Sequence, residues 1–341
     1  MPEQKLIFRN KPQINISTPS TARMWLVCAV AFFTVLQSSL GDNGQSLVTA
    51  LTAFFTAVVI ELFTSNGRAK LDNILNGSSV TTALVLSLML PNQLHPVYAV
   101  FGTIFAIVVI KYSFGGLGSN WFNPALGGWL FIRISWQKPF EEALEGSLYS
   151  STEMVLSSNV SAIDNSVTSF FNSTVFSFSD VQLHSGYIDL LFLNNPAIIA
   201  DRGIFALLIG TLVITALGIN RGWIPLVYLA VYGFLIRFAG DVSGLLWNGD
   251  LLFGLFSGGT LATAFILAAE PSSAAKSKTG VVIVVVLAAV LSWFFRYKCM
   301  EFAGSFIALA FVNCLTPLVR LFEEKYLFVC NSRTVASENI L

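Results

Sequence analysis

Ten apolar stretches, each almost free of charged residues, run along the chain and rule out an ordinary water-soluble fold. They occupy residues 24–40, 47–64, 79–90, 97–112 and 122–134 and, after a long polar interval, 203–219, 223–238, 251–269, 281–295 and 303–319. Charged residues make up 11% of the 341 residues, whereas a soluble domain carries roughly 25% because its surface has to be solvated. A helix crosses a bilayer with about 20 apolar residues. The sequence therefore predicts an all-α, polytopic membrane protein.

Two of the shorter stretches resemble each other. Residues 76–91 and 256–271 both run from small hydroxyl or glycine residues through a short apolar segment to a proline, and Pro91 and Pro271 are 180 residues apart (271 − 91). Segments this short are typical of broken helices, which survive where protein buries their free backbone groups. We expect about ten helices in two inverted five-helix repeats whose broken half-helices meet near the midplane, where transport sites are usually built. The alternative is that two short apolar helices simply look alike.

The distribution of basic residues predicts the orientation of the chain. With ten spans, one side receives most of the loop Lys and Arg residues, including Lys111, whereas Arg296 and Lys298 fall on the other side. The interval 137–201 carries one basic and eight acidic residues. We therefore expect both termini in the cytoplasm and no cleavable signal peptide. The expected organisation is a cytoplasmic tail (1–23), a first membrane repeat (24–136), an extracytoplasmic loop (137–201), a second membrane repeat (202–320) and a cytoplasmic tail (321–341).

Several classes of function lack any signal. The formal net charge is zero, which provides no basic field for nucleic acid. None of the four cysteines lies in a CxxC pair, so we predict no metal site, no disulfide framework and no iron–sulfur cluster in this chain. We expect the two histidines, His95 and His184, to be solvated or to cap a helix.

The most distinctive segment is a glycine-rich turn at residues 112–128. Gly115 and Gly116 permit close approach of the backbone, Asn120 and Asn123 offer amide donors and acceptors, and Pro124 suits the first turn of a following helix. Glycine-lined turns with amides are suitable walls for an uncharged aromatic ligand. The alternative is a tight turn that lets two helices pack. The glycine spacing is no dinucleotide fingerprint, because no βαβ unit surrounds it.

These segments together resemble one family. The run FGGLGSNWFNPAL at 114–126 is the most specific, and it is accompanied by residues 77–91, 194–196, 223–225, 257–271 and 312–317. The chain is similar to the RnfD/NqrB family, membrane subunits of ion-translocating ferredoxin:NAD and NADH:quinone oxidoreductase complexes, and its short N-terminal tail looks more like RnfD. The resemblance implies a bacterial inner-membrane translocase subunit with other membrane and peripheral subunits as partners.

The resemblance also implies flavin. In the family, FMN is attached through its phosphate to a Thr in a motif like Asp-x-x-Ser-Gly-Ala-Thr in the outer loop, and this chain departs from that motif. Backward alignment from residues 189–196 places Thr174 at the attachment position, with Thr168 where the Asp belongs. Attachment at Thr168 or no attachment are the alternatives. The resemblance further implies a second, non-covalent flavin, for which Gly115, Gly116, Asn120 and Asn123 are the candidates.

Two acidic residues within the apolar stretches are candidates for the ion path, since a charge inside a bilayer is costly. Glu61 lies near the end of the second stretch, and Glu270 precedes Pro271, where the family usually has Asp-Pro. Alternatively, Glu61 is an interfacial residue beside Arg68 and Glu270 a helix-end carboxylate in water.

The sequence thus predicts a subunit that couples flavin-mediated electron transfer to Na⁺ or H⁺ translocation. It names no catalytic residue, and the subunit is expected to be catalytically incomplete alone. The alternatives are a flavin-free channel or small-solute transporter on the same scaffold, and a purely structural membrane subunit.

Overall fold

The structure, a computed structural model, describes residues 20–64, 75–113, 120, 122–144, 166, 169–170, 172–174, 198–218, 221–239, 251–270, 275 and 277–323. Within these residues all regular structure is helical, and β-pairing is limited to one isolated bridge between Pro91 and Ile198. The predicted all-α class is confirmed for this part of the chain.

The helices fall into two groups along the chain. The first group comprises α1 (Ser20–Leu40), α2 (Gln45–Thr64), α4 (Ser78–Met89), α5 (Pro96–Ile104), the π-helical segment η1 (Phe105–Tyr112), α6 (Pro124–Ser135) and α7 (Gln137–Leu144). The second comprises α11 (Ile199–Arg202), α12 (Ile204–Ala216), α13 (Trp223–Ala239), α14 (Leu251–Phe256), α15 (Thr260–Ala262), the π-helical segment η2 (Thr263–Leu267), α16 (Lys278–Trp293), the π-helical segment η3 (Phe294–Lys298) and α17 (Gly304–Phe322).

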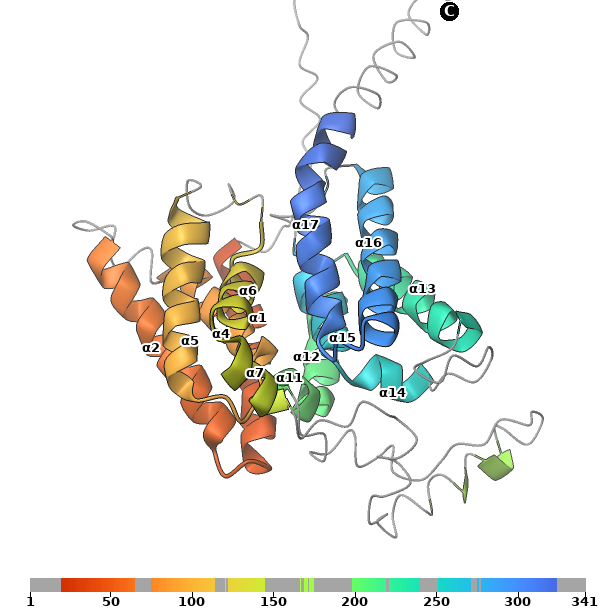
Figure 1. The fold of residues 1–341 in the computed structure, drawn as a ribbon, viewed down its shortest axis with the longest axis horizontal. Helices are drawn as coiled ribbons and strands as arrows, with labels where there is room; N and C mark the ends of the chain where they lie inside the picture. Colours follow the sequence, from red (N-terminus) through yellow and green to blue (C-terminus); the bar gives the residue numbers. More distant parts are fainter. Residues whose placement is uncertain are drawn as a thin grey trace, which may run out of the picture.

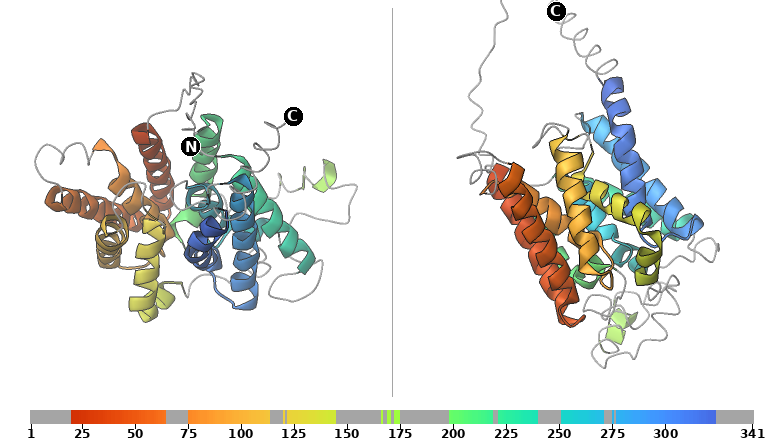
Figure 2. Two further views of the ribbon diagram at one scale, coloured as in Figure 1. Left: turned by 90° about the horizontal axis from the view of Figure 1, so that it is seen from above. Right: turned by 60° about the vertical axis from the view of Figure 1, so that its left-hand side comes forward.

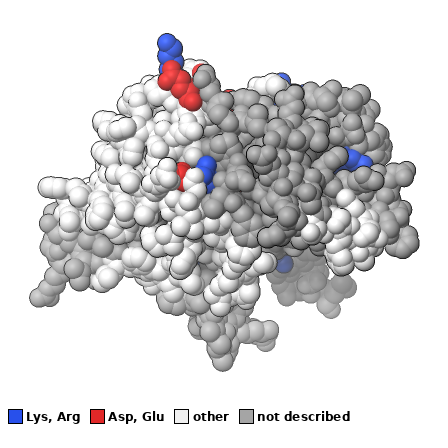
Figure 3. Space-filling view, turned by 90° about the horizontal axis from the view of Figure 1, so that it is seen from below, with Lys and Arg blue, Asp and Glu red and all other residues white. Residues whose placement is uncertain are grey.

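Membrane insertion is consistent with the length and the surface of these helices. Within the described residues, four helices are long and apolar enough to cross a bilayer, namely Thr21–Leu40, Gln45–Thr64, Lys278–Lys298 and Gly304–Phe322, and four shorter apolar helices accompany them. Large apolar side chains such as Phe33, Phe55 and Leu212 are exposed on them, and the described part of the face in Figure 3 shows few charged side chains. The chain is a multi-pass membrane protein, since surfaces of this kind are stable in lipid.

The two groups of helices lie side by side and meet along the middle of the molecule (Figures 1 and 2). One contact joins α1 to α12, where Gly203 approaches so closely that a Cβ atom would lie 2.3 Å from the Thr34 carbonyl oxygen. A second joins α6 to α17, where the rings of Trp129 and Phe306 pack edge to face with centroids 5.4 Å apart. Small residues and close side-chain packing are the usual means by which membrane helices associate.

Local sequence explains where several helices begin. The Asn123 side chain accepts a hydrogen bond from the Leu126 amide at the start of α6, and Pro124 occupies its first turn. His95 caps α5 in the same way. Both arrangements satisfy amide groups that the first turn of a helix leaves unpaired, and they confirm the predicted roles of Pro124 and of a capping His95.

Each group contains a short buried helix that begins at a left-handed glycine. Gly77 precedes α4 and Gly259 precedes α15, and both have φ of 68°, a conformation that glycine adopts without steric cost. The apolar stretch expected at 251–269 is therefore not one helix, because the chain turns between α14 and α15. In contrast, the predicted short helix at 79–90 is present as α4.

The expected extracytoplasmic loop begins with a structured segment. Helix α7 lies against α6, and its Phe140 is buried against the Trp129 ring, with centroids 5.8 Å apart. Most of residues 145–197 lie outside the described part of the chain.

Candidate functional site

A contact between the two groups of helices connects two of the residues that the sequence singles out. The Asn123 amide Nδ2 donates a hydrogen bond to Glu270 Oε2, across 147 residues of chain. Asn123 is buried at the start of α6, and Glu270 is half-buried just after the second short helix. Glu270 is therefore not simply a helix-end carboxylate in water, since the buried amide of the other group contacts it.

Asn120 offers a hydrogen-bond acceptor close to this contact in the chain. Its side chain is 6% exposed, and its amide oxygen Oδ1 is buried with no hydrogen-bond partner within the described residues. An orphaned buried acceptor is costly, and a ligand that carries an N–H group would satisfy it. Gly115 and Gly116 lie outside the described residues.

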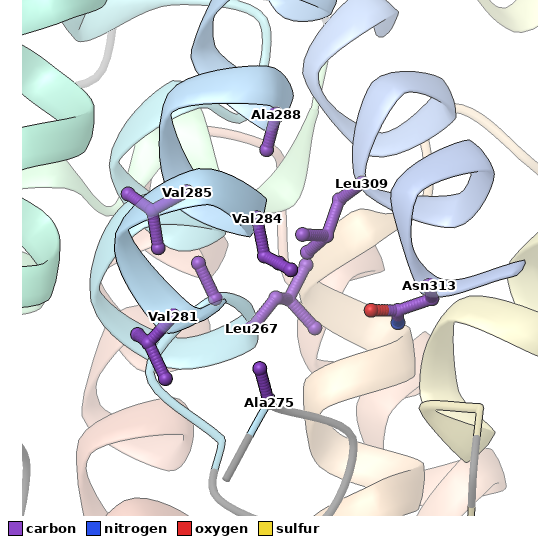
Figure 4. A pocket seen from close by; sticks show the side chains of 9 residues that line it. Leu267, Ala275, Val281, Val284, Val285, Ala288, Leu309 and Asn313 are labelled. Carbon is purple, nitrogen blue, oxygen red and sulfur yellow. The ribbon is translucent and has the colours of Figure 1, made fainter. Parts of the chain in front are cut away.

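A small apolar pocket lies between the second short helix, α16 and α17 (Figure 4). Its one polar lining residue is Asn313, which is buried and points from α17 toward Leu267 and Val284. The amide nitrogen Nδ2 of Asn313 has no hydrogen-bond partner within the described residues. The pocket is too apolar to hold an ion and is a packing defect with one amide at its edge.

Glu61 lies in a buried cluster at the end of α2. The Ser79 hydroxyl donates a hydrogen bond to Glu61 Oε1, and the Tyr112 hydroxyl donates one to Oε2 at 2.5 Å. The ammonium of Lys111 donates to Ser79 Oγ at 2.5 Å and lies 3.6 Å from Glu61 Oε1. We call these four residues the Lys111 cluster.

This arrangement corrects two expectations. Glu61 is 2% exposed and Lys111 is 4% exposed, so Glu61 is not an interfacial residue that extends to the membrane surface. Lys111 is not a loop charge either, since η1 carries it into the interior. An apolar pattern hides such a residue, because the pattern reports the average character of a segment and not the direction of one side chain.

A second buried basic residue occurs in η3. The Arg296 guanidinium, 6% exposed, donates from Nη1 to the Gly254 carbonyl at 3.0 Å and to the Ser257 carbonyl at 2.5 Å. It also donates to Ser257 Oγ and, at 3.2 Å, to Thr260 Oγ1. Tyr232 of α13 completes the set at 3.3 Å. We call these residues the Arg296 cluster.

The carboxylate of Asp201 supports the same turn from α11. The Gly259 amide donates to Asp201 Oδ1 at 2.9 Å and to Oδ2 at 3.2 Å. A carboxylate at the N-terminus of a helix satisfies free amides and is stabilised by the helix dipole. Asp201 and Arg296 therefore both hold the turn that begins the second short helix.

Thr174 lies in a different environment from these buried residues. It belongs to a short described segment, 172–174, where its side chain is exposed and its hydroxyl donates to the Phe170 carbonyl at 2.7 Å. An exposed hydroxyl is accessible to an attaching enzyme. Thr168 lies outside the described residues.

Metal-binding chemistry has no cluster to support it in the described part of the chain. No group of three or more His, Cys, Asp or Glu side chains is close enough there to hold a metal ion. Cys28, Cys299 and Cys314 are free thiols.

Comparison with known proteins decides the family. A model of the NQR2, RnfD, RnfE family matches residues 7–328, which is nearly the whole chain. The chain belongs to this family. The glycine-rich turn and the two proline-terminated segments predict the same family, and the prediction is confirmed.

Relatives within the NQR2, RnfD, RnfE family are named as D subunits of oxidoreductase complexes. The chain is 26% identical over 330 residues to the D subunit of the proton-translocating ferredoxin:NAD⁺ oxidoreductase complex of Clostridium ljungdahlii, covering 94% of this chain and 95% of that protein. It is 31% identical over 294 residues to the D subunit of the ion-translocating oxidoreductase complex of Alcanivorax borkumensis, covering 82% and 83%. It is 27% identical over 252 residues to the Na⁺-translocating counterpart of Acetobacterium woodii, covering 74% and 72%.

Among the buried charged residues, sequence reasoning missed Lys111, Arg296 and Asp201 as functional candidates. In the predicted topology, Arg296 lies on the same side of the membrane as the acidic loop 137–201. This misplaced charge could have identified Arg296 from the sequence. A basic residue that violates the charge rule is a candidate for burial with partners inside the protein.

Proposed function

We propose that this chain is the D-type membrane subunit of an Rnf-type complex, carrying electrons through flavin while the complex moves Na⁺ or H⁺. The observation that carries the proposal is the family match over residues 7–328, together with a relative of the D type that covers 94% of the chain. Its partners are then the other membrane and peripheral subunits of that complex. Its location is the bacterial inner membrane, with both termini in the cytoplasm and the loop between the repeats outside.

We propose the ten-helix inverted repeat as the scaffold for this function. It is supported by the matching order of helices, which pairs α1, α2, α4, α5 and α6 with α12, α13, α15, α16 and α17. Gly77 and Gly259 precede corresponding short helices with the same φ, and π-helical segments follow both α5 and α16. The boundaries 24–136 and 202–320 remain the proposed limits of the repeats.

We assign the non-covalent flavin to the turn that ends at α6. The orphaned Oδ1 of Asn120 is the feature that fits such a group, because a flavin ring presents an N–H edge. Both amide atoms of Asn123 already contact Glu270 and Leu126, so Asn123 orients the turn while Asn120 receives the ligand. Gly115 and Gly116 form the proposed wall. A bound flavin supplies the electron-carrying chemistry that side chains lack.

Thr174 is the proposed site of covalent FMN. Its exposure and its place in the alignment with the family motif support this position. Glu61 and Glu270 are proposed for the ion path, because both are carboxylates inside the helical bundle that contact residues of other helices.

In-gel fluorescence tests the flavin assignment. The complex is co-expressed with a flavin-attaching enzyme and separated on a denaturing gel, and we expect a fluorescent band for this subunit. Thr174→Ala should abolish the fluorescence, whereas the matched control Ser173→Ala should retain it. Flavin released from the native complex on denaturation reports the non-covalent group, and Asn120→Leu should remove most of it.

The outcomes separate the competing functions. Fluorescence that persists in Thr174→Ala and disappears in Thr168→Ala moves the attachment site. A native preparation of the wild-type complex in which this subunit carries no flavin of either kind overturns the electron-carrier proposal and favours the flavin-free transporter.

A further inference from the structure

The Lys111 cluster contains a set of oxygen atoms that is suited to a cation. The Glu61 carboxylate, the Ser79 hydroxyl and the Tyr112 hydroxyl come together from α2, α4 and η1. Carboxylate and hydroxyl oxygens are hard ligands, which hard cations prefer over nitrogen or sulfur. Ser79 and Tyr112 lie 18 and 51 residues from Glu61 in the chain, so the fold itself assembles the three groups.

The chain's own ammonium already lies among these groups. Lys111 Nζ is 2.5 Å from Ser79 Oγ and 3.6 Å from Glu61 Oε1. Both charges are withdrawn from solvent, with Glu61 2% exposed and Lys111 4% exposed. Removing two charges from water is costly unless each compensates the other. The ammonium therefore supplies the positive charge that a bound cation would otherwise supply.

Lysine is suited to leave such a position. Its ammonium is a compact charge on a flexible four-carbon stem, and its three donors rotate freely. Within the described residues, the contacts of Lys111 Nζ are to side chains, namely a hydroxyl and a carboxylate, so its departure leaves no carbonyl of the described backbone unsatisfied. Lys111 also belongs to a π-helical segment, a conformation that is often found at functional sites.

We infer that Lys111 is a tethered cation that occupies a monovalent-cation site made by Glu61, Ser79 and Tyr112. A translocated cation enters only by displacing the ammonium, and Lys111 thereby sets the affinity of the site. This inference rests on the proposed place of Glu61 in the ion path. To the proposed role of Glu61, the inference adds Lys111 as the residue that determines cation affinity and the hydroxyls of Ser79 and Tyr112 as two further oxygen ligands.

Equilibrium binding of ²²Na⁺ to the purified complex tests the inference. The complex is measured at constant ionic strength with choline as the replacement cation, in the wild type, Lys111→Met and the double variant Glu61→Gln/Lys111→Met. Methionine keeps the unbranched shape of lysine and removes its charge. Because Lys111→Met removes the ammonium that competes with Na⁺, we expect this variant to bind Na⁺ about tenfold more tightly than the wild type. If the wild type binds no Na⁺ at this position, the variant should show one additional site. The double variant should lose this gain.

Thermal unfolding of the same samples verifies the fold and gives a second readout. Na⁺ should raise the Tm of Lys111→Met more than it raises that of the wild type or the double variant, because a cation that binds the native state stabilises it. Lys111→Gln serves as the alternative if Lys111→Met does not assemble. A folded Lys111→Met or Lys111→Gln complex that binds ²²Na⁺ no more tightly than the double variant overturns the inference.

A transport measurement distinguishes this failure from failure of the proposed function. Glu61→Gln is reconstituted in liposomes, and electron-driven ion movement is compared with the wild type. Unchanged translocation overturns the role of Glu61 in the ion path. In contrast, lost translocation together with no gain of Na⁺ binding in Lys111→Met keeps that role and removes the tethered-cation inference.

Discussion

The Lys111 cluster and the Arg296 cluster are two solutions to the same problem, a buried positive charge at the end of a helix. Each basic residue lies in a π-helical segment, η1 or η3, and each contacts the first turn of a short helix. The partners differ. Lys111 contacts a hydroxyl and a carboxylate, whereas Arg296 donates to the backbone carbonyls of Gly254 and Ser257.

This difference distinguishes the Arg296 guanidinium, which has a structural role, from the Lys111 ammonium, which a cation can replace. Backbone carbonyls that lose their donor inside a protein remain as buried unsatisfied acceptors. Guanidinium donors also have a fixed planar geometry that matches several acceptors at once. Arg296 therefore holds the backbone of the turn before α15. Lys111 instead compensates the charge of a carboxylate and contacts side chains. The predictions below test this contrast, beginning with the largest expected effect.

Arg296→Met should be the most damaging change. It removes the guanidinium donor from the carbonyls of Gly254 and Ser257, to which the Thr260 hydroxyl also donates, and it removes the positive charge of Arg296 from near Asp201. Breaking a buried charged network costs about 3–5 kcal/mol. Thermal unfolding of the purified subunit complex measures the loss. Arg296→Lys is the matched control and should recover part of the stability, since an ammonium satisfies fewer acceptors. Stability equal to the wild type in Arg296→Met would refute the structural role.

Glu61→Gln should reduce the stability less than Arg296→Met does. Adding Lys111→Met should recover part of this loss. The single variant leaves the Lys111 ammonium buried without its carboxylate, at a cost near the lower end of the about 3–5 kcal/mol for breaking a buried ion pair, because the Ser79 hydroxyl still accepts from the ammonium. Adding Lys111→Met removes that charge, so the double variant should be more stable than Glu61→Gln alone. Unfolding free energies of the four members of this double-mutant cycle measure the coupling. Additive losses would show that the two groups do not form a pair.

The Arg133–Glu141 pair, in which Glu141 is exposed and Arg133 half-buried, provides the reference for an ion pair that water reaches, and it should have the smallest effect. Its atoms Nη1 and Oε1 are 3.1 Å apart. Hydrogen bonds from Gln137 and then from Arg133 hold the pKa of Glu141 below its usual value of 4.5. Its contribution is therefore present above that value and is lost as the pH falls through the lowered pKa.

Glu141→Gln should leave the thermal stability at pH 7 unchanged within error, because solvent and salt screen such pairs. Unfolding followed from neutral to acidic pH should show a slightly weaker acid dependence than the wild type. A large loss at pH 7 would instead mean that α7 depends on this pair for its position, and the contrast between buried and exposed pairs would fail.

Much of the molecule follows from local sequence. The apolar stretches predict the helices, because a membrane helix must present apolar side chains along its whole length. Pro124 predicts the start of α6, because a proline is suited to the first turn of a helix. The glycine-rich turn and the segments that end at Pro91 and Pro271 are sufficient to predict the family.

The partners of the charged residues could not be predicted in this way. Lys111 and Arg296 both count as loop charges in the sequence, since the charge rule considers side chains one at a time and ignores what lies beside them. Glu61 meets Ser79 and Tyr112 only because α2, α4 and η1 pack together. Likewise, Asn123 meets Glu270 only through the packing of the two groups of helices.

The sequence by itself determined that the chain is helical, that it spans a membrane and to which family it belongs, because hydropathy, caps and short motifs act over a few residues. Only the tertiary structure decided which charges are compensated and by what. Inside a low-dielectric interior a buried charge is tolerated only where distant segments bring a partner to it, and that proximity is a property of the packed helices.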